Sequence, residues 1–253
     1  MNTRRQSINE LIDQRHFLTD GGLETVLVFQ KEVELPCFAA FDILGRDWGA
    51  AMLEDYYRDY LHLAARHNAG FVLETPTWRA SYGWGVQLGY SRDEIAAANH
   101  KAVALMERIR EAHGDVEPVL ISGNIGPRGD GYVPGERMSA EEAAEYHSHQ
   151  IQTFADTAAD MVTALTLNYA EEAIGVVQAA ESAGMPVVLS FTVETDGRLP
   201  SGQTLGDAIA QVDEATDSYT SYYMINCAHP THFEDMLAGA GSWRARVRGL
   251  RGN

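Results

Sequence analysis

The sequence has few cysteines and no long apolar run. Its 253 residues include two cysteines, Cys37 and Cys227, which cannot form the disulfide framework of a small secreted domain. No run of about 18 apolar residues is present, so we expect no transmembrane helix. The N-terminal stretch MNTRRQSINELIDQRH is polar and lacks the apolar core of a signal peptide. These features favour a cytoplasmic protein.

Positive charge is also scarce. The chain has 19 basic against 36 acidic residues, a formal net charge of -17. Such a field repels phosphate backbones, which argues against nucleic acid and anionic membranes as partners. The 45% hydrophobic and 22% charged composition is typical of a soluble globular protein. The length suits one large α/β domain.

Short apolar runs alternate with helix-like segments along the whole chain. Several of the runs are continuously apolar, which is typical of parallel strands covered on both faces. The spacing predicts a helix over 50–68, and Ser91 with Glu94 has the pattern of a capping box at a helix start. The same pattern is found at Ser139 with Glu142 and at Thr231 with Glu234, with looser versions at Asn168 with Glu171 and Thr204 with Asp207. The predicted strands are 16–20, 69–77, 117–126, 159–167, 185–195, 222–227 and 245–253.

This repeated strand-then-helix order fits either a (β/α) barrel or an open doubly wound sheet. A dinucleotide-binding sheet would carry G-x-G-x-x-G after its first strand, and the turn here is DGGLET. We therefore favour the barrel. No linker or composition change divides the chain, so residues 1–253 are predicted to form a single α/β domain.

In a parallel barrel the functional site lies at the carboxyl ends of the strands. Asp20, Gly21 and Gly22 end the first predicted strand, and paired glycines let the backbone approach a ligand closely. A tight turn capped by Asp20 explains the same residues equally well. The glycine-rich segment 122–135 lacks Gly-Lys-Ser/Thr, so a plain rim loop is favoured over a phosphate site.

Two other candidate features lie at these strand ends. Trp78, Tyr82 and Trp84 could hold a cationic methyl donor by cation–π attraction, although packing on the rim is the favoured interpretation. Cys227 ends the sixth predicted strand. From its position alone it could be a buried small residue, a nucleophile paired with His229, or a metal ligand.

Four segments together resemble the homocysteine S-methyltransferase family. They are FLTDGGLET, SGNIGPRGD, PVVLSFTVETDGRLPSGQTLGDAI and INCAHPTHFEDML, in this order from Phe17 onward. The resemblance implies a zinc-dependent (β/α)8 TIM-type barrel. It further implies transfer of a methyl group from S-methylmethionine, S-adenosylmethionine, betaine or a methylfolate to homocysteine, giving methionine. The expected partners are therefore small molecules, and a homo-oligomer is compatible with the pattern.

The resemblance also assigns roles to single residues. Cys227 corresponds to the first of three thiolates that bind Zn²⁺, and the metal would ionise the homocysteine thiol, since only a thiolate attacks carbon well. Asp20 is the second catalytic candidate. The homocysteine-binding residues implied are Asp20, Gly21, Gly22 and Thr166, and those of the methyl-donor region are Thr75, Trp78 and Asn124.

The sequence departs from the family pattern in two places. The Gly-Gly-Cys-Cys motif of the last strand, which carries the other two zinc ligands, does not occur, and a catalytic zinc needs three protein ligands. Cys37 lies too early in the chain to replace that pair, and His229 is a weak substitute. Leu165 stands where the family has a glutamate that contacts the substrate amine, with Glu171 or Glu194 as conceivable replacements.

Three explanations fit the departures: a shortened version of a longer enzyme, a divergent relative without zinc, or a site completed by a partner subunit. With the last β/α unit missing, we expect the open barrel edge to be covered by another subunit or bulged, or the fold to be unstable. The leading expectation for function is a homocysteine methyltransferase. The alternatives are a non-catalytic barrel that binds a small amino acid or onium compound without zinc, and a hydrolase using Cys227 with His229.

Overall fold

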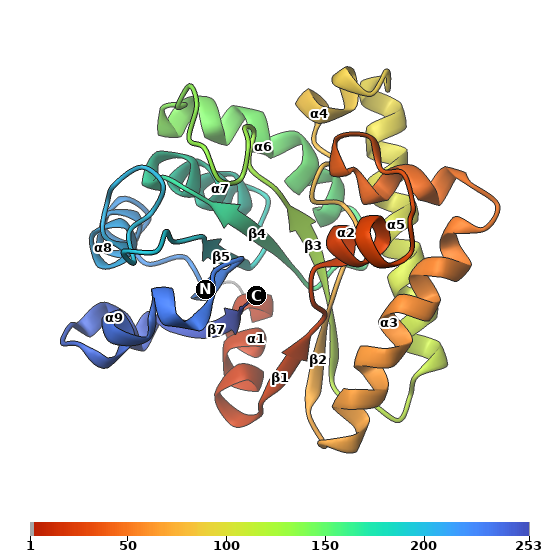
Figure 1. Cartoon of the computed structure of the whole chain (residues 1–253), viewed down its shortest axis with the longest axis horizontal. Helices are drawn as coiled ribbons and strands as arrows, with labels where there is room; N and C mark the ends of the chain where they lie inside the picture. The colour runs from red at the N-terminus through yellow and green to blue at the C-terminus, as the bar shows by residue number, and fades with distance from the viewer. Residues whose placement is uncertain (1–2, 253) are drawn as a thin grey trace.

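The computed structural model describes residues 3–252 of the chain, with side chains from residue 6 onward. Seven parallel strands, in the order β1 to β7, form a nearly closed barrel (Figure 1). This confirms the barrel predicted from the sequence, and each predicted strand contains the observed one. The strands are β1 Phe17–Thr19, β2 Gly70–Glu74, β3 Val119–Ile125, β4 Met161–Leu167, β5 Val187–Phe191, β6 Tyr222–Asn226 and β7 Val247–Arg251.

The helices cover the outside of the barrel, except α1, which lies near its lower end beside β1 and β7 (Figure 1). None of the helices in the described range is long and apolar enough to cross a membrane. The α-helices are α1 Thr3–Gln14, α2 Leu23–Thr25, α3 Gly49–Arg66, α4 Tyr82–Gln87, α5 Arg92–Ala112, α6 Ala140–Ala155, α7 Ala170–Ser182, α8 Leu205–Ala215 and α9 Glu234–Ala238. Shorter turns are η1 Val26–Gln30, η2 Pro36–Phe38, η3 Ala40–Gly45, η4 Pro230–His232 and η5 Ser242–Arg246.

Helix starts follow the sequence signals where the cap lies at the end of a regular loop. Ser91 begins α5 and Ser139 begins α6, each with a complete capping box. Thr204 caps α8, because its hydroxyl accepts a hydrogen bond from the Asp207 N–H at 3.1 Å. These hydroxyls satisfy backbone donors that the first helical turn leaves free.

Two predicted caps are wrong. Thr231 lies inside η4, where its N–H donates to His229 Nδ1 at 3.3 Å, and α9 begins only at Glu234. Asn168 does not cap α7, because its Nδ2 donates to the Asp130 carbonyl at 3.0 Å and Tyr169 occupies the N-cap position. In both cases a tertiary or loop contact takes the side chain that the local pattern assigned to the helix.

The barrel interior changes from apolar to polar along the strands. At the amino end, Ile8 of α1 packs into a cluster with inward-facing strand residues, which are Val72, Met161, Val188, Tyr222 and Met224. One layer higher, Ser122 and Thr163 hydrogen-bond to each other at 2.7 Å. The larger apolar cluster fills the space between strands and outer helices. Hydrophobic burial therefore stabilises the barrel, and the carboxyl ends of the strands are left to polar groups.

The gap in the barrel lies between β1 and β7. Among the described residues these strands form no ladder, and Leu250 on the outer face of β7 is 55% exposed. The β6–β7 register shifts between Tyr223 and Met224, so the bulge expected near an open edge is present. Arg248 of β7 forms an ion pair with Asp13 of α1, which brings that helix beside the gap.

Candidate active site

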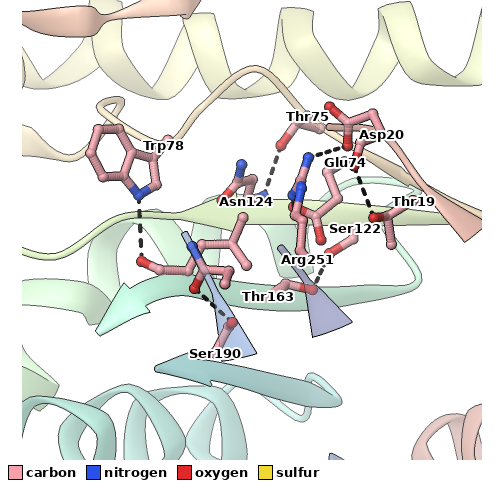
Figure 2. Close-up of polar contacts among 12 residues, drawn as sticks. Thr19, Asp20, Glu74, Thr75, Trp78, Ser122, Asn124, Thr163, Ser190 and Arg251 are labelled. Carbon is pink, nitrogen blue, oxygen red and sulfur yellow. Dashed lines mark hydrogen bonds and ion pairs between the residues drawn. The ribbon is translucent and has the colours of Figure 1, made fainter. Parts of the chain in front are cut away.

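A buried arginine joins three strands at the carboxyl-end rim. Arg251, at the end of β7, contacts the Asp20 carboxylate and the Gly21 carbonyl, and its Nη1 lies 3.3 Å from Glu74 Oε2 (Figure 2). The Tyr56 hydroxyl of α3 donates to Asp20 Oδ2 at 3.0 Å. The Arg251 side chain is 13% exposed and the two carboxylates 3% and 2%. The first, second and last strands thus meet in one charged cluster.

Sequence reasoning found Asp20 but missed Glu74 and Arg251. Both are charged residues at the ends of strands, and their side chains meet in the buried cluster. The signal available was alternation, because residues two apart on a strand share a face: Val72 lies in the inner apolar cluster, so Glu74 follows on the same face. A single charge after an apolar run is also common in exposed loops. The pattern alone therefore did not distinguish Glu74 and Arg251 from exposed loop residues.

Burial dominates the acid–base properties of this cluster. It raises the pKa of Asp20, against the opposing effect of Arg251. Burial also raises the pKa of Glu74 to about 7 and that of Glu24, in α2, to about 7. A carboxyl group that titrates near neutral pH can exchange a proton during a reaction at that pH.

The two glycines after Asp20 lie between two helices: Gly21 packs closely against α3, and Gly22 precedes α2. A Cβ added at Gly21 would lie 2.6 Å from the Tyr60 hydroxyl of α3. Gly22 begins α2, and its carbonyl accepts from the Val26 N–H at 2.9 Å. The close approach at Gly21 is therefore to the protein's own helix, in line with the structural interpretation of this turn. Its role in binding homocysteine stays a prediction.

Cys227 follows β6 on the same rim. Its N–H donates to the Arg251 carbonyl at 3.1 Å, which places the thiol on the strand end next to the charged cluster. Its sulfur is half-buried and accepts from Asn226 Nδ2 at 3.2 Å. The sulfur also contacts the Tyr132 hydroxyl, and burial together with Cys227 raises the pKa of Tyr132. The thiol thus faces polar groups and lies outside the aliphatic core.

Asn226 connects the thiol to two neighbouring strands. Its Oδ1 accepts from the Thr166 N–H at 2.9 Å and from the Ser190 hydroxyl at 2.7 Å. Its Nδ2 donates to Thr166 Oγ1 at 2.9 Å and to the Cys227 sulfur. All hydrogen-bonding capacity of the amide is therefore used. Thr166 and Cys227 both have positive φ, 63° and 54°, which is uncommon outside glycine and is stabilised here by these contacts.

The loop after β3 crosses the rim toward Cys227. Trp84 Nε1 donates to the Pro127 carbonyl at 3.1 Å, and Arg79 Nη1 donates to the Gly129 carbonyl at 2.9 Å. Buried Glu172 of α7 accepts from the Arg128 N–H at 2.7 Å. These contacts position the segment that carries Tyr132, so the glycine-rich sequence forms a rim loop, as favoured over a phosphate site.

The aromatic residues after β2 stack on arginines of the chain itself. Arg79 lies between Trp78 and Trp84, 3.9 Å and 3.8 Å from the ring centroids, and burial lowers its pKa to about 10. Tyr82 packs on Arg92 at 4.4 Å. Packing on the rim, the favoured interpretation, therefore describes these rings. The assignment of Trp78 to the methyl-donor region stays a prediction.

Thr75 and Asn124 lie next to each other in the rim, between Trp78 and Asp20 in the view of Figure 2. Thr75 Oγ1 hydrogen-bonds to Thr77 Oγ1 at 2.6 Å and accepts from the Asn124 N–H at 2.9 Å. The Thr75 hydroxyl thus fixes the backbone of β3. Asn124 is 8% exposed as a residue, and its Oδ1 has no hydrogen-bond partner among the described residues.

Among the described hydrogen bonds and ion pairs, the suggested replacements for the missing family residues make no contact with Cys227 or with the Arg251 cluster. Glu171 accepts from Gln211 of α8 at 3.2 Å in the outer layer, and Glu194 is exposed. His229 Nδ1 bonds to Thr231 Oγ1 at 2.8 Å, which uses the imidazole as the cap of η4 instead of a partner for Cys227. Cys37 is exposed. Leu165 is buried at 6% exposure, and its carbonyl accepts from Trp78 Nε1 at 3.4 Å.

The described residues do not fit the metal site that the resemblance implies. Over residues 3–252, no group of three His, Cys, Asp or Glu side chains could hold a metal ion. Cys227 is the thiol at this rim, and its sulfur contacts an amide and a phenol, while a catalytic zinc needs three protein ligands. We therefore derive no chemical step through a metal.

A parallel barrel with buried carboxylates and a thiol at its carboxyl-end rim defines an enzyme-type scaffold for small molecules. The family model for homocysteine S-methyltransferase matches residues 17–249, so the chain belongs to the homocysteine S-methyltransferase family. Its enzyme class is therefore methyltransferase. A comparison with curated proteins gives no match.

Solved structures of the homocysteine methyltransferase MmuM from Escherichia coli share the fold. The metallated form is 20% identical over 96% of this chain and 93% of that chain, with a TM-score of 0.74. The oxidized form is 19% identical over 94% of this chain and 90% of that chain, also at 0.74. The apo form is 20% identical with a TM-score of 0.67, at 94% and 90% coverage.

Proposed function

We propose that this protein transfers a methyl group from an onium-type donor to the thiol of homocysteine, giving methionine. The candidate donors are S-methylmethionine, S-adenosylmethionine and betaine. The observation that carries the proposal is the meeting of Asp20 and Cys227 at one rim, although 207 positions separate them (227 − 20). Arg251 connects them through its side chain on Asp20 and its carbonyl on the Cys227 N–H.

The reaction balances without an oxidant or reductant. The homocysteine sulfur forms a bond to the methyl carbon while the donor's bond to that carbon breaks, and the donor leaves as a neutral thioether or amine. The thiol proton must leave, because the thiolate is the nucleophile. Holding both reactants in line at the rim supplies the proximity that such a displacement needs.

The rim provides groups suited to accept that proton. Glu24 and Glu74 titrate at about 7, so a fraction of each is ionised and basic at neutral pH. Asp20 is held by Arg251 and Tyr56 and stabilises the arrangement of the site. Asn226 donates to the Cys227 sulfur, which keeps it fixed against the end of β6.

A methyl-transfer assay tests the proposal. Purified protein is incubated with L-homocysteine and each donor, with and without added Zn²⁺, and methionine is measured by mass spectrometry. We expect methionine from at least one donor, its loss in Cys227→Ser, and its retention in Cys37→Ser, whose thiol is exposed and outside the described contacts of the rim. No methionine from any donor in either metal condition contradicts the proposal.

A second candidate is binding of an amino acid or onium compound without turnover. Leu165 at the rim and a single thiol beside Asn226 and Tyr132 favour it. Thermal melting with homocysteine, methionine or betaine in the absence of metal separates the two. Stabilisation by a ligand without product formation supports simple binding, and a stability gain that requires zinc argues against it.

A further inference from the structure

Asn124 presents a buried hydrogen-bond acceptor at the rim that no group of the described residues uses. Its backbone is fixed on both sides, because its N–H donates to Thr75 Oγ1 at 2.9 Å and its carbonyl accepts from Thr77 Oγ1 at 2.7 Å. The residue is 8% exposed, and Oδ1 has no partner in the described part of the chain. Buried amide oxygens are nearly always hydrogen-bonded, so this atom is suited to accept a donor from a ligand.

The surroundings of Asn124 select the charge of that donor. Figure 2 shows Asn124 between Trp78 and Arg251 along the rim, on the side where Glu74 also lies. The Asp20 carboxylate interacts with those of Glu24 and Glu74, and Arg251 opposes both interactions. Burial raises the pKa of these carboxyl groups, and a bound cation favours their ionised form, so a positively charged ligand suits this part of the rim.

The Asn124 oxygen needs a hydrogen-bond donor, and this requirement excludes some cationic groups as its partner. A sulfonium or quaternary ammonium carries no N–H and cannot satisfy an amide oxygen. A primary ammonium has three donors and a positive charge. Leu165, nearby on β4, is apolar and uses its carbonyl for Trp78, so its side chain offers no competing polar contact.

We propose that Asn124 Oδ1 accepts a hydrogen bond from the α-ammonium group of an amino-acid substrate, with the rim carboxylates supplying the opposite charge. This inference rests on the proposed methyl transfer and assigns a specificity residue to it. The α-ammonium comes either from the thiol substrate or from an amino-acid sulfonium donor. Both share the chemistry that the site recognises.

Calorimetric titration with matched ligand pairs tests the assignment. The first pair is L-homocysteine and 4-mercaptobutanoate, and the second is S-methyl-L-methionine and 4-(dimethylsulfonio)butanoate; the two ligands of each pair differ only in the α-ammonium. We expect the wild type to prefer the ammonium ligand in at least one pair by about tenfold, the usual effect of a hydrogen bond to a charged group. Asn124→Ala removes that preference, and the pair affected identifies the source.

Two further variants make the result specific. Asn124→Asp keeps an acceptor and retains the preference, which also gives a readable variant where the alanine variant does not fold. Ser122→Ala changes a buried inward residue of the same strand, one layer deeper, and leaves the preference unchanged. Melting temperatures report the folding of each variant.

The outcomes separate this inference from the proposed function. A wild type without ammonium preference, or an Asn124→Ala variant that keeps it, overturns the assignment even where methionine is formed. Equal weakening of both ligands of a pair also overturns it, because a general loss of structure has that effect. A wild type that binds neither pair and forms no methionine overturns both proposals.

Discussion

Single side chains at the rim are held by contacts from distant parts of the chain. Arg251 pairs with two buried carboxylates, and Asn226 hydrogen-bonds to a backbone N–H, two hydroxyls and a thiol. Buried charges are tolerated when they are paired and hydrogen-bonded, and removing one partner leaves the other uncompensated. Substitution of a residue that holds several buried partners is therefore expected to lower the stability of the protein strongly.

Arg251→Met should destabilise the protein strongly. The change leaves Asp20 and Glu74 buried without their cation, and loss of one member of a buried pair costs about 3–5 kcal/mol. Arg248→Met on the same strand is the matched control, since its ion pair with Asp13 is 35% and 63% exposed, and such pairs contribute about 0–1 kcal/mol. Urea unfolding at neutral pH measures both. Similar losses for the two variants would contradict the buried clamp.

Glu74→Gln should change how stability depends on pH. The pKa of Glu74 rises from 4.5 to about 7 on folding, so between these values the folded state keeps a proton that the unfolded state has released. The Glu74 contribution to stability therefore falls as pH rises through this window. Glutamine does not titrate. From the acidic to the neutral end of this pH window, the unfolding free energy of the variant should therefore rise relative to that of the wild type by up to about 3 kcal/mol.

Unfolding free energies of wild type and Glu74→Gln at both ends of that window provide the measurement. The difference between the proteins isolates Glu74 from the other titrating groups. A constant difference across the window would mean that Glu74 has an ordinary carboxyl pKa in the folded protein.

At the scale of helices and strands, the sequence predicted the strands and some of the helix caps correctly, and failed at other caps. The strands were found because continuous apolar runs identify buried parallel strands, and Ser91 and Ser139 were correct because a capping box is a local signal. Thr231 and Asn168 were misread because contacts with His229 and Asp130 compete for their polar groups.

Ser139→Ala should cost about 1 kcal/mol of unfolding free energy, because it removes the hydroxyl that caps α6. Thr231→Ala, at a site with the same sequence pattern but no α-helical cap, should cost clearly less. Chemical denaturation of both variants checks this. Equal costs at the two sites would show that the sequence pattern, and not the observed cap geometry, governs stability there.

Across the whole molecule, α1 contributes a side chain to the interior of the barrel. Ile8 is 3% exposed and packs with inward-facing residues of the strands. Ile8→Ala should therefore cost about 2–5 kcal/mol, as for other core truncations. Ile12→Ala, whose side chain is only partly buried against the same cluster, should cost less. A negligible effect at Ile8, measured by urea unfolding, would mean that the helix is not docked in solution.

The barrel followed from the order and spacing of the apolar runs, whereas the site followed only in part. Asp20 and Cys227 could be found because each lies at a strand end within a recognisable local motif. Glu74 and Arg251 could not, since their pairing depends on which strands become neighbours across the barrel gap. The unpartnered oxygen of Asn124 is likewise a property of the assembled rim, where Thr75 and Thr77 fix its backbone.

The Arg251 contacts have a consequence for protein synthesis. Arg251 lies 231 positions after Asp20 and 177 after Glu74, and chains grow at about 5–20 residues per second. For many seconds both carboxylates are outside the ribosome while their cation has not yet been added. A nascent chain should keep them hydrated until then, so this end of the barrel matures only after translation passes residue 251, and proteases or chaperones should reach it in the interval.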